Sequence, residues 1–492
     1  MNLEGNISWD FLKNVSDALD SYRIRVFIDA KEEILEAGIY DENQYYKILF
    51  KMFDEEKLKY TLYNFLKNYQ NSNFETLQNF SKLSSLELKK VFSLLELLKN
   101  EHLIIIQNNI QGDKLESRNF KNYSIKATGV EPSEIKSIYE PVKIIFDSKN
   151  CSGCSLCAGI CPVNCLNIYN GFGKIEENKC IRCGLCYFSC PRSFLPVNIL
   201  NMYQDNCSEF QVYTNIGPYK EIYSARTNLM DIVHTCQDGG ITSTALYYLF
   251  DKKEIDLALG AKMSSTIWRP EPILIKNIED ILITTGTKYV NNPTLRLLNE
   301  LNNVSKSLAI VGVPCMMQAL LKSEIYNTGI PSLNNVKYKI GIFCMESFSY
   351  ESILKICEIL KVNINDIKKM DINKGKFIVY TNSEESYNIP VKEISDLARP
   401  DCELCFDLTS ESADISIGSI GSPIGWNTVI IRTEKGKKLY ENLVSNKLIE
   451  SKPIENVEPG LPLLQKVAGS KKNKCKKHIT SRSNENLRVP QY

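Results

Sequence analysis

Two stretches of sequence decide the organisation of this chain, and each carries four cysteines. They read Cys151-Ser-Gly-Cys154-Ser-Leu-Cys157-Ala-Gly-Ile-Cys161-Pro162 and Cys180-Ile-Arg-Cys183-Gly-Leu-Cys186-Tyr-Phe-Ser-Cys190-Pro191. Zinc sites do not need two runs of four cysteines that each end in Pro, and disulfide scaffolds are typical of small secreted chains. Three closely spaced thiolates followed by a fourth suit an iron–sulfur cluster. The two stretches therefore indicate iron–sulfur ligation and transfer of single electrons.

The spacing matches the bacterial-type ferredoxin pattern for two 4Fe–4S clusters, in which the fourth cysteine of each run serves the other cluster. On that rule the first ferredoxin set is Cys151, Cys154, Cys157 and Cys190. The second ferredoxin set is Cys180, Cys183, Cys186 and Cys161. Val142–Phe146 is predicted to be the first strand of this module. A module of this size buries little apolar surface, so we expect the clusters themselves to stabilise it.

The composition is that of an ordinary globular protein with several domains. The chain has 492 residues, of which 43% are hydrophobic and 24% charged. The 59 basic and 58 acidic residues give a formal net charge of +1, which provides no overall attraction to nucleic acid or to an anionic membrane. No apolar run approaches the roughly 20 residues of a membrane span. The 17 cysteines, without a secretory signal, favour a cytoplasmic protein.

The first part of the chain, without cysteines, is predicted to be a small helical domain. Apolar residues recur at helical spacing in 45–53 and 58–69, and a further helix is expected over 84–99, with Ser84 or Ser85 as its cap. A strand at 102–107 and a second at 123–125 complete a winged-helix-like arrangement. Acidic residues interrupt the basic residues of the last helix, so the pattern favours protein docking or a structural role over DNA binding.

From about residue 215 the pattern alternates between helices and strands, which is typical of α/β domains. We expect helices at 242–250, 316–321, 350–360 and 436–443, and strands at 255–259, 308–311, 336–343 and 428–431. The Lys-rich stretch Ser470–Arg482 is predicted to be a solvated and mobile tail.

Four further cysteines form what we call the dispersed set: Cys315, Cys344, Cys402 and Cys405. Cys315 and Cys344 follow predicted strands, and ligand-carrying loops in α/β domains gather at the carboxyl ends of strands. Four converging thiolates would hold a third 4Fe–4S cluster. The alternatives are a zinc site on the Cys402-x-x-Cys405 pair, or inert buried thiols at the other two positions. Outside these sets, Cys165, Cys207 and Cys357 are interpreted as packing residues.

Two glycine-containing turns suggest a ligand site. Cys236-Gln-Asp-Gly-Gly-Ile-Thr-Ser243 precedes a predicted helix, whose free N–H groups suit a phosphate or the edge of a flavin ring. Thr285-Gly-Thr-Lys-Tyr289 combines a glycine turn with a cation and an aromatic ring. The candidate cofactor-binding residues in these turns are Asp238, Gly239, Gly240, Thr242, Ser243, Gly286, Thr287, Lys288 and Tyr289.

The segment from about residue 213 to 443 resembles the beta subunits of coenzyme F-420 hydrogenases and dehydrogenases. The resemblance lies in the two glycine turns and in three further blocks: Ile310-Val-Gly-Val-Pro-Cys-Met-Met-Gln-Ala319, Ile340-Gly-Ile-Phe-Cys-Met-Glu-Ser-Phe348, and Arg399-Pro-Asp-Cys-Glu-Leu-Cys-Phe-Asp407 with Ala413–Gly418. It implies FAD at the two turns, a 4Fe–4S cluster on the dispersed set, and the 8-hydroxy-5-deazaflavin coenzyme as hydride carrier. Cys236, commonly Gly in the family, and Val313, often Thr, depart from the pattern.

The sequence thus predicts an α+β multidomain iron–sulfur flavoprotein that passes electrons between coenzyme F-420 and one-electron carriers, with ferredoxin or a partner oxidoreductase subunit as electron partner. It names no catalytic residue. The alternatives are a reductase of another small molecule with the same cofactors, and an iron–sulfur redox sensor whose winged helix binds DNA. The expected divisions are a winged-helix-like domain at 1–127, a ferredoxin domain at 140–200, an FAD-binding region at 213–300, a third-cluster region at 301–455 and a basic tail at 456–492.

Overall fold

The computed structural model divides the chain into two compact units. One unit contains 1–144, 176–188 and 326–328, and the other contains 145–175, 189–325 and 329–492. The residues described are 58–59, 62–63, 65–69, 72–84, 86–100, 104–108, 123–127, 140–180, 185–193, 195, 197, 200, 215–265, 268–302, 304–325, 331–485, 487–490 and 492. In this part of the chain, no helix combines the length and the apolar character needed to cross a membrane.

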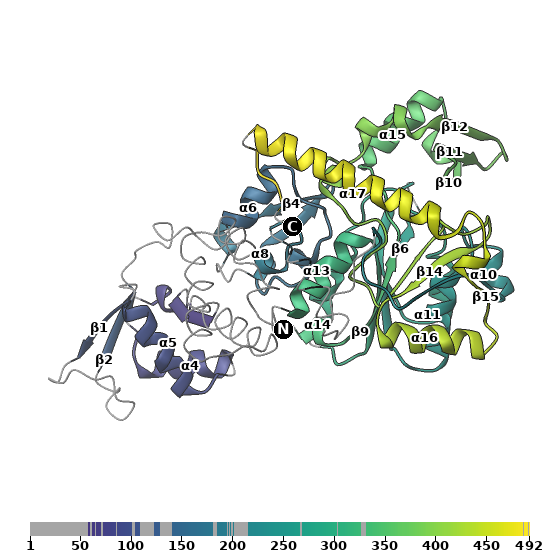
Figure 1. The fold of residues 1–492 in the computed structure, drawn as a ribbon. Helices are drawn as coiled ribbons and strands as arrows, with labels where there is room; N and C mark the ends of the chain where they lie inside the picture. Colours follow the sequence, from purple (N-terminus) through teal and green to yellow (C-terminus); the bar gives the residue numbers. More distant parts are fainter. Residues whose placement is uncertain are drawn as a thin grey trace, which may run out of the picture. The chain divides into compact units, whose positions relative to one another are not determined.

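In the first unit, two helices pack against a two-stranded hairpin (Figure 1). The elements are α4 (Phe74–Ser84), α5 (Leu88–Asn100), β1 (Ile104–Asn108) and β2 (Tyr123–Ala127). Val91, Leu94, Leu95 and Leu98 of α5 are fully buried, because this spacing places them on one face of the helix. The order of helices and hairpin agrees with the expected wing, and the winged-helix assignment itself stays a prediction. The expected helix at 45–53 lies outside the described residues.

The predicted helix at 84–99 is confirmed as α5, but its expected cap at Ser84 is wrong. Ser84 belongs to α4, where its hydroxyl donates to the carbonyl of Phe80 at 2.6 Å. Such a bond to the residue four positions earlier is typical of serine inside a helix. The alternative cap, Ser85, lies outside the described residues.

The predicted strand at 142–146 is wrong, because this segment is helix α6 (Glu140–Asp147). Val142 and Ile145 are buried, whereas Ile144 is half exposed, so burial follows a spacing of three rather than two. Pro141 stands in the first turn of the helix, where its missing N–H costs no hydrogen bond. The ferredoxin module continues with α7 (Leu156–Gly159), the antiparallel strands β3 (Leu166–Tyr169) and β4 (Phe172–Ile175), and α8 (Leu185–Ser189).

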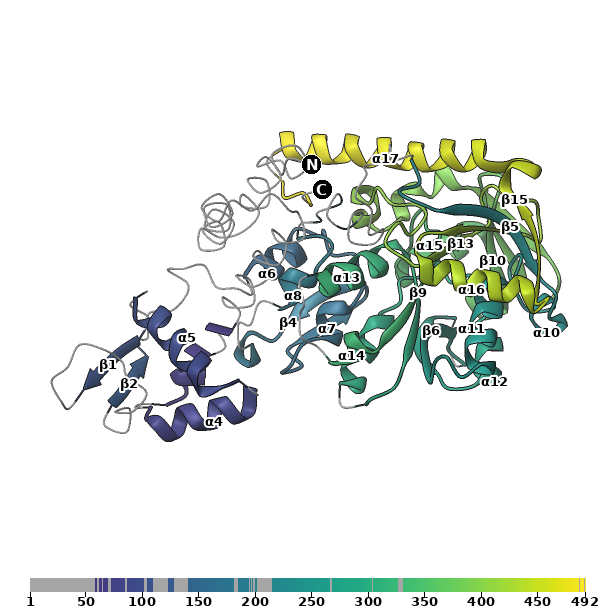
Figure 2. The same cartoon turned by 60° about the horizontal axis from the view of Figure 1, so that its bottom comes forward.

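An eight-stranded mixed sheet forms the centre of the second unit (Figure 2). Its order is β15-β5-β14-β13-β9-β8-β6-β7, in which β13, β9, β8 and β6 are parallel neighbours. The strands are β5 (Glu221–Thr227), β6 (Leu257–Met263), β7 (Pro270–Ile275), β8 (Leu308–Gly312), β9 (Val336–Ile342), β13 (Ile415–Gly418), β14 (Asn427–Ile431) and β15 (Ile449–Pro453). The expected α/β character is therefore confirmed, with antiparallel strands added at both edges.

Helices cover both faces of this sheet. Val429 and Ile431 of β14 face a core shared with α11 (Ile241–Asp251) and α16 (Glu434–Ser445), while Ile430 between them faces a core shared with α17 (Gly460–Asn484). This alternation is the period of two expected for a strand buried on both sides. The remaining α-helices of the sheet domain are α10 (Met230–Val233), α12 (Ile278–Leu282), α13 (Pro314–Ile325) and α14 (Pro331–Asn334).

A smaller antiparallel sheet packs against one helix to form a separate core. The sheet contains β10 (Ile367–Asn373), β11 (Lys376–Thr381) and β12 (Ser386–Pro390), and the helix is α15 (Tyr350–Leu360). The helix has the predicted bounds, and the Ser349 hydroxyl caps it by accepting a hydrogen bond from the Ser352 N–H at 3.0 Å. Short 3₁₀ helices are η3 (Glu177–Lys179), η4 (Thr294–Leu301), η5 (Ile364–Asp366), η6 (Val391–Glu393), η7 (Ser395–Leu397), η8 (Pro400–Leu404) and η9 (Ile454–Asn456).

The stretch predicted to be a mobile tail is the long helix α17, so that prediction is wrong (Figure 1). The helix buries Leu464, Ala468, Lys471 and Cys475, which share one face because they follow helical spacing. It lies against η8, which carries Cys402. The expected tail is therefore part of the candidate site.

Candidate functional site

The first ferredoxin set is assembled within one unit of the structure. Cys151 and Cys154 are buried on the loop that leads into α7, and Cys157 is buried within α7 itself. Burial, followed by the nearby charge of Cys190, raises the pKa of Cys151 to about 12 and that of Cys154 to about 11. The fourth cysteine therefore lies beside the loop that carries the other three, as the ferredoxin spacing predicts.

The sulfurs of the first set accept hydrogen bonds from backbone N–H groups. The Gly173 N–H donates to Cys151 Sγ at 3.3 Å, and the Arg192 N–H donates to Cys190 Sγ at 3.4 Å. Gly153 allows this tight loop, because its φ is +67° and a Cβ there would lie 2.5 Å from the Gly171 oxygen. Such bonds stabilise negative charge on sulfur and tune a bound cluster.

The second ferredoxin set is divided between the two units and stays a prediction. Cys161 belongs to one unit, Cys180 and Cys186 belong to the other, and Cys183 lies outside the described residues. Cys161 Sγ accepts a hydrogen bond from the Cys165 N–H at 3.3 Å and lies 3.5 Å from Cys165 Sγ. Cys165 is buried, as expected of a packing residue, and it packs directly against a predicted ligand.

The cysteines of the dispersed set lie close enough to affect one another's charge. Cys315 stands in the first turn of α13 after β8, and Cys344 stands just after the neighbouring strand β9. Burial raises the pKa values of Cys315 and Cys344, and the charge of Cys405 raises both further. Burial raises the pKa of Cys402 in the same way, followed by the charges of Asp401 and Cys344. These cysteines thus lie within electrostatic reach of other members of the set, near the carboxyl ends of β8 and β9, and their role as ligands stays a prediction.

Buried cations surround the dispersed set, which suits an anionic cluster. The Lys471 ammonium donates to the carbonyls of Cys344 and Asp407, at 2.5 and 2.8 Å. Burial opposes its charge, but the charges of Cys405, Cys344 and Cys402 raise its pKa. Arg192 Nε is buried and has no hydrogen-bond partner among the described residues, which leaves a donor for an acceptor such as a cluster sulfide. The four thiolates of the dispersed set would need such positive charge, and iron would supply the rest.

The zinc alternative for the Cys402-x-x-Cys405 pair requires ligands about 2.3 Å from a single ion. In the described part of the chain, no group of three or more His, Cys, Asp or Glu side chains is arranged to hold one metal ion. Both the zinc site and the third cluster therefore stay predictions.

The glycines of the first turn predicted to bind FAD are also required by the fold. Gly240 has a φ of +70° and immediately precedes α11, and Gly239 lies so close to β14 that a Cβ would meet the Asn427 nitrogen at 2.5 Å. Thr242 and Ser243 are partly exposed in the first turn of α11. Gln237 Nε2 is buried without a hydrogen-bond partner among the described residues, which leaves one donor at this turn for a ligand.

The two turns lie close to each other and to the dispersed set. Burial raises the pKa of Tyr289, and so do the charges of Asp371, Asp238 and Cys344. Asp238 accepts a hydrogen bond from the Ser419 hydroxyl, and burial followed by the charge of Asp371 raises its pKa. Tyr289 of one turn therefore lies within electrostatic reach of Asp238 of the other. The same tyrosine lies within electrostatic reach of Cys344.

The second turn is held by its own lysine. Lys288 Nζ donates to the carbonyls of Thr285 and Gly286, at 2.6 and 2.9 Å, and to the carbonyl of Thr284. Burial lowers the pKa of Lys288 to about 8. The predicted contact of Lys288 with a flavin or an anionic coenzyme stays a prediction, and its three donors are engaged with backbone oxygens. Gly286 and Thr287 are exposed.

Several residues of the site carry no spacing signal in the sequence. Asp371 comes from the small sheet and Ser419 from a turn after β13, so only the tertiary structure brings them to Asp238. Lys471 and Cys475 lie in a stretch whose composition resembles a solvated tail. The burial of Cys475 raises its pKa to about 12, as does the charge of Cys405. A helical repeat of buried positions in α17 was the one available signal.

Comparisons with known proteins match three parts of this chain. The family model for the N-terminal part of the coenzyme F-420 hydrogenase/dehydrogenase beta subunit matches residues 222–299. The model for the C-terminal part of the same beta subunit matches residues 305–457. A 4Fe–4S binding domain matches residues 174–195.

Two relatives and one solved structure extend these matches. The beta subunit of coenzyme F-420 hydrogenase from Methanothermobacter thermautotrophicus is 38% identical over 56% of this chain and 99% of its own length. The coenzyme F-420-dependent sulfite reductase of Methanocaldococcus jannaschii is 30% identical over 71% of this chain and 53% of its own length. A chain of the xenon-derivatised F-420-reducing NiFe hydrogenase complex from Methanosarcina barkeri superposes with a TM-score of 0.54, at 35% identity, over 57% of this chain and 99% of that one.

Proposed function

This chain belongs to the family of coenzyme F-420 hydrogenase and dehydrogenase beta subunits, and on that premise we propose that it exchanges electrons between coenzyme F-420 and one-electron carriers. The proposed cofactors are FAD and three 4Fe–4S clusters. A flavin can accept a hydride from a deazaflavin and release the electrons singly, which an iron–sulfur cluster requires. The proposed electron partner is ferredoxin or another subunit of a complex.

One observation carries this proposal: the candidate groups form a continuous series. Tyr289 and Asp238 bring the two predicted flavin turns together, and Tyr289 is within electrostatic reach of Cys344 in the dispersed set. Cys315 of the dispersed set is within the same reach of Cys154 in the first ferredoxin set. These electrostatic influences support the proposed route, from the predicted flavin turns through the dispersed set to the ferredoxin module.

Each part of the series has a distinct task. Gln237 offers a buried donor to the flavin, and Lys288 fixes the backbone that carries Tyr289. Burial raises the pKa of Asp238, whose carboxylate accepts a hydrogen bond from the Ser419 hydroxyl beside the first turn. Lys471 and Arg192 place positive charge beside thiolates that burial disfavours. The side chains thus supply a binding turn and counter-charge.

The test uses anaerobically purified protein. We expect about twelve irons per chain with matching sulfide and little zinc, and a flavin visible in the absorbance spectrum. Reduced coenzyme F-420 with a viologen dye as acceptor should restore the deazaflavin absorbance at a rate that depends on the protein. About eight irons with one zinc would contradict the third cluster, and the absence of flavin would contradict the proposed hydride route.

A second candidate is a reductase of another small molecule with the same cofactors. The 30% identity to a relative named as a sulfite reductase favours it, although this chain covers 53% of that relative. If reduced coenzyme F-420 is oxidised only when a small inorganic acceptor such as sulfite is added, the second candidate replaces the first. Turnover with ferredoxin or a viologen dye alone supports the first.

A further inference from the structure

A buried network of charged side chains joins the first ferredoxin set to the dispersed set. Asp401 lies 3.0 Å from Arg399 and 4.0 Å from Arg192, and all three are at most 3% exposed. Arg399 Nη2 donates to the carbonyl oxygen of Cys151 at 2.8 Å. Asp401 directly precedes Cys402 of the dispersed set. The network therefore touches both sets.

The charge of Arg192 reaches both sets, whereas that of Lys471 reaches one. The Arg192 N–H donates to Cys190 Sγ of the first set at 3.4 Å, and its guanidinium lies 4.0 Å from Asp401, the residue before Cys402 of the dispersed set. The Lys471 ammonium donates to the carbonyl of Cys344 in the dispersed set at 2.5 Å. Arg192 thus stands between the two sets, and Lys471 belongs to the dispersed set.

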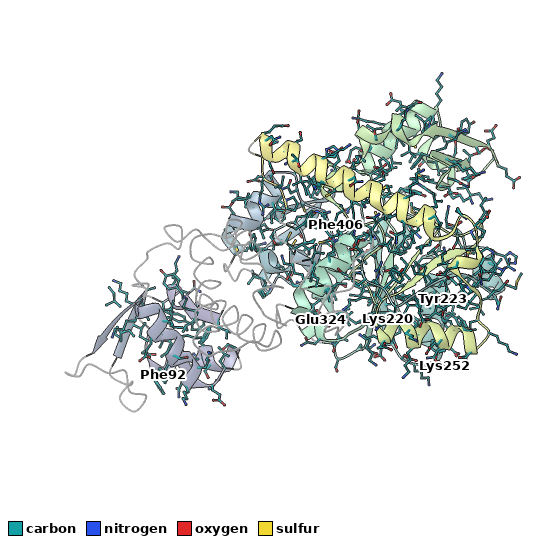
Figure 3. All side chains as sticks on the ribbon, in the orientation of Figure 1. Phe92, Lys220, Tyr223, Lys252, Glu324 and Phe406 are labelled. Atoms are coloured by element: carbon teal, nitrogen blue, oxygen red, sulfur yellow. The ribbon has the colours of Figure 1, made fainter. Side chains whose placement is uncertain are left out.

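Tyr492 holds the guanidinium of Arg192 in place. Arg192 Nη1 donates to the Tyr492 hydroxyl at 2.8 Å, and that hydroxyl donates to the carbonyl of Leu404. The Tyr492 ring packs edge-on against Phe406, with 4.9 Å between ring centres. The Lys472 ammonium of α17 also lies 5.6 Å from the ring centre of Phe406. Phe406 is labelled in Figure 3. Tyr492 follows the family match, which ends at residue 457.

We propose that Arg192, fixed by Tyr492, is a shared counter-charge that sets the reduction potentials of the first ferredoxin cluster and the third cluster together. The inference rests on the proposed function, because both clusters are part of it. Reduction adds one electron to a cluster and thus one negative charge, without making or breaking a bond. A buried cation stabilises the reduced form and raises the potential. Arg192 is therefore a positioning residue for electron transfer between the two clusters.

The experiment is a redox titration of the full chain with dithionite, monitored by electron paramagnetic resonance, together with iron and sulfide analysis. A Cys402→Ala variant assigns the signal of the third cluster. We expect Arg192→Gln to lower both reduction potentials by at least about 59 mV, which corresponds to a tenfold change in the equilibrium constant for one-electron reduction. Lys471→Gln should lower only the potential of the third cluster. Tyr492→Phe should lower both reduction potentials by a smaller amount. The control Tyr169→Phe, at an exposed position, should change neither potential.

The outcomes separate this inference from the proposed function. A wild-type protein with about eight irons contradicts the third cluster itself. With about twelve irons present, an Arg192→Gln variant that shifts one potential or none overturns the shared counter-charge alone. If Arg192→Gln does not retain its iron, Tyr492→Phe decides, since it removes only a hydroxyl. Loss of iron in both variants would show that the network has a structural role in holding the clusters, and would overturn the proposal.

Discussion

The first ferredoxin set takes three of its four sulfurs from one short loop, whereas the dispersed set takes its sulfurs from separate places along the chain. Cys151, Cys154 and Cys157 are close because the loop into α7 is tight. Cys315 and Cys344 follow β8 and β9, which are parallel neighbours. Local spacing therefore suffices to predict one set, while the other depends on the sheet. Substitutions in each set test whether both nevertheless behave as cluster sites.

The largest effect is expected from Cys402→Ala. Loss of one thiolate should remove the third cluster, so the iron content should fall from about twelve to about eight per chain. Transfer from reduced coenzyme F-420 to a viologen dye should slow by about 100-fold or more, because the series of redox groups is interrupted. Iron analysis and a steady-state assay measure both effects.

The matched control for Cys402→Ala is Cys357→Ala, which also removes a buried thiol, but from the core beneath α15. It should keep all its iron. A Cys402→Ala protein that retains twelve irons would show that this cysteine is not a ligand and that the two sets differ in kind.

A smaller and more selective effect is expected from Cys154→Ser. The flavin should still be reduced by reduced coenzyme F-420, because the dispersed set remains, but onward transfer to ferredoxin should slow by about tenfold or more. Stopped-flow spectroscopy separates the two steps. Tyr169→Phe, on the exposed hairpin of the same module, is the control. If Cys154→Ser transferred electrons to ferredoxin at the wild-type rate, the ferredoxin module would have a structural role only.

A pH effect of a few fold is expected at the second glycine turn. The pKa of Lys288 is lowered by burial to about 8, so a rise in pH through that value removes a proton and one of the hydrogen bonds that fix the turn. Binding of FAD and coenzyme F-420 should weaken by about threefold from pH 7 to pH 9, since one neutral hydrogen bond contributes about 1 kcal/mol. Fluorescence titration of flavin and coenzyme measures this.

The same lysine should act on folding stability with the opposite sign. Its pKa is about 8 in the folded chain against an ordinary value of 10.5, so the unfolded chain binds more protons between these values and stability rises with pH there. Lys288→Met should remove both pH effects, and Lys276→Met, at an exposed position, should keep them. Identical binding profiles for Lys288→Met and the wild type would show that protonation of this lysine does not govern ligand binding.

The smallest effect is expected from Cys475→Ala. This buried thiol is near Cys405 but follows neither the strand ends nor the Cys402-x-x-Cys405 pair. We expect an unchanged iron content and turnover within about twofold of the wild type, because four other thiolates complete a cluster. A loss of about four irons would place Cys475 among the ligands and remove one of the predicted four.

The sequence predicted most of the elements that position the site. The helix at 350–360 has the expected bounds because Ser349 caps it and its apolar residues share one face. The alternating strands and helices after residue 215 are confirmed because their apolar runs are long and periodic. Cys315 and Cys344 follow neighbouring parallel strands, as expected, and their role as ligands stays a prediction.

The remaining residues of the site, and helix α6, could not be predicted because they depend on tertiary contacts that the sequence composition does not show. Lys471 was interpreted as a solvated charge, yet it donates to two carbonyls beside the dispersed set. Arg192, Asp401 and Tyr492 have no motif spacing, and their network exists only when the ferredoxin module and η8 are folded together. The segment 142–146 was short enough for a strand and a helix to compete, and the spacing of its buried residues decided for the helix.

The parallel pairing of β8 with β9 also sets an order of assembly. A short segment such as 151–157 closes at small entropic cost. It can therefore bind iron early, before the rest of the chain has folded. The dispersed set cannot bind iron this early, because its cysteines come together only after the connection through α13 has formed and β9 has paired with β8. We therefore expect iron to enter the molecule in two phases during refolding, with the slower phase governed by formation of the sheet.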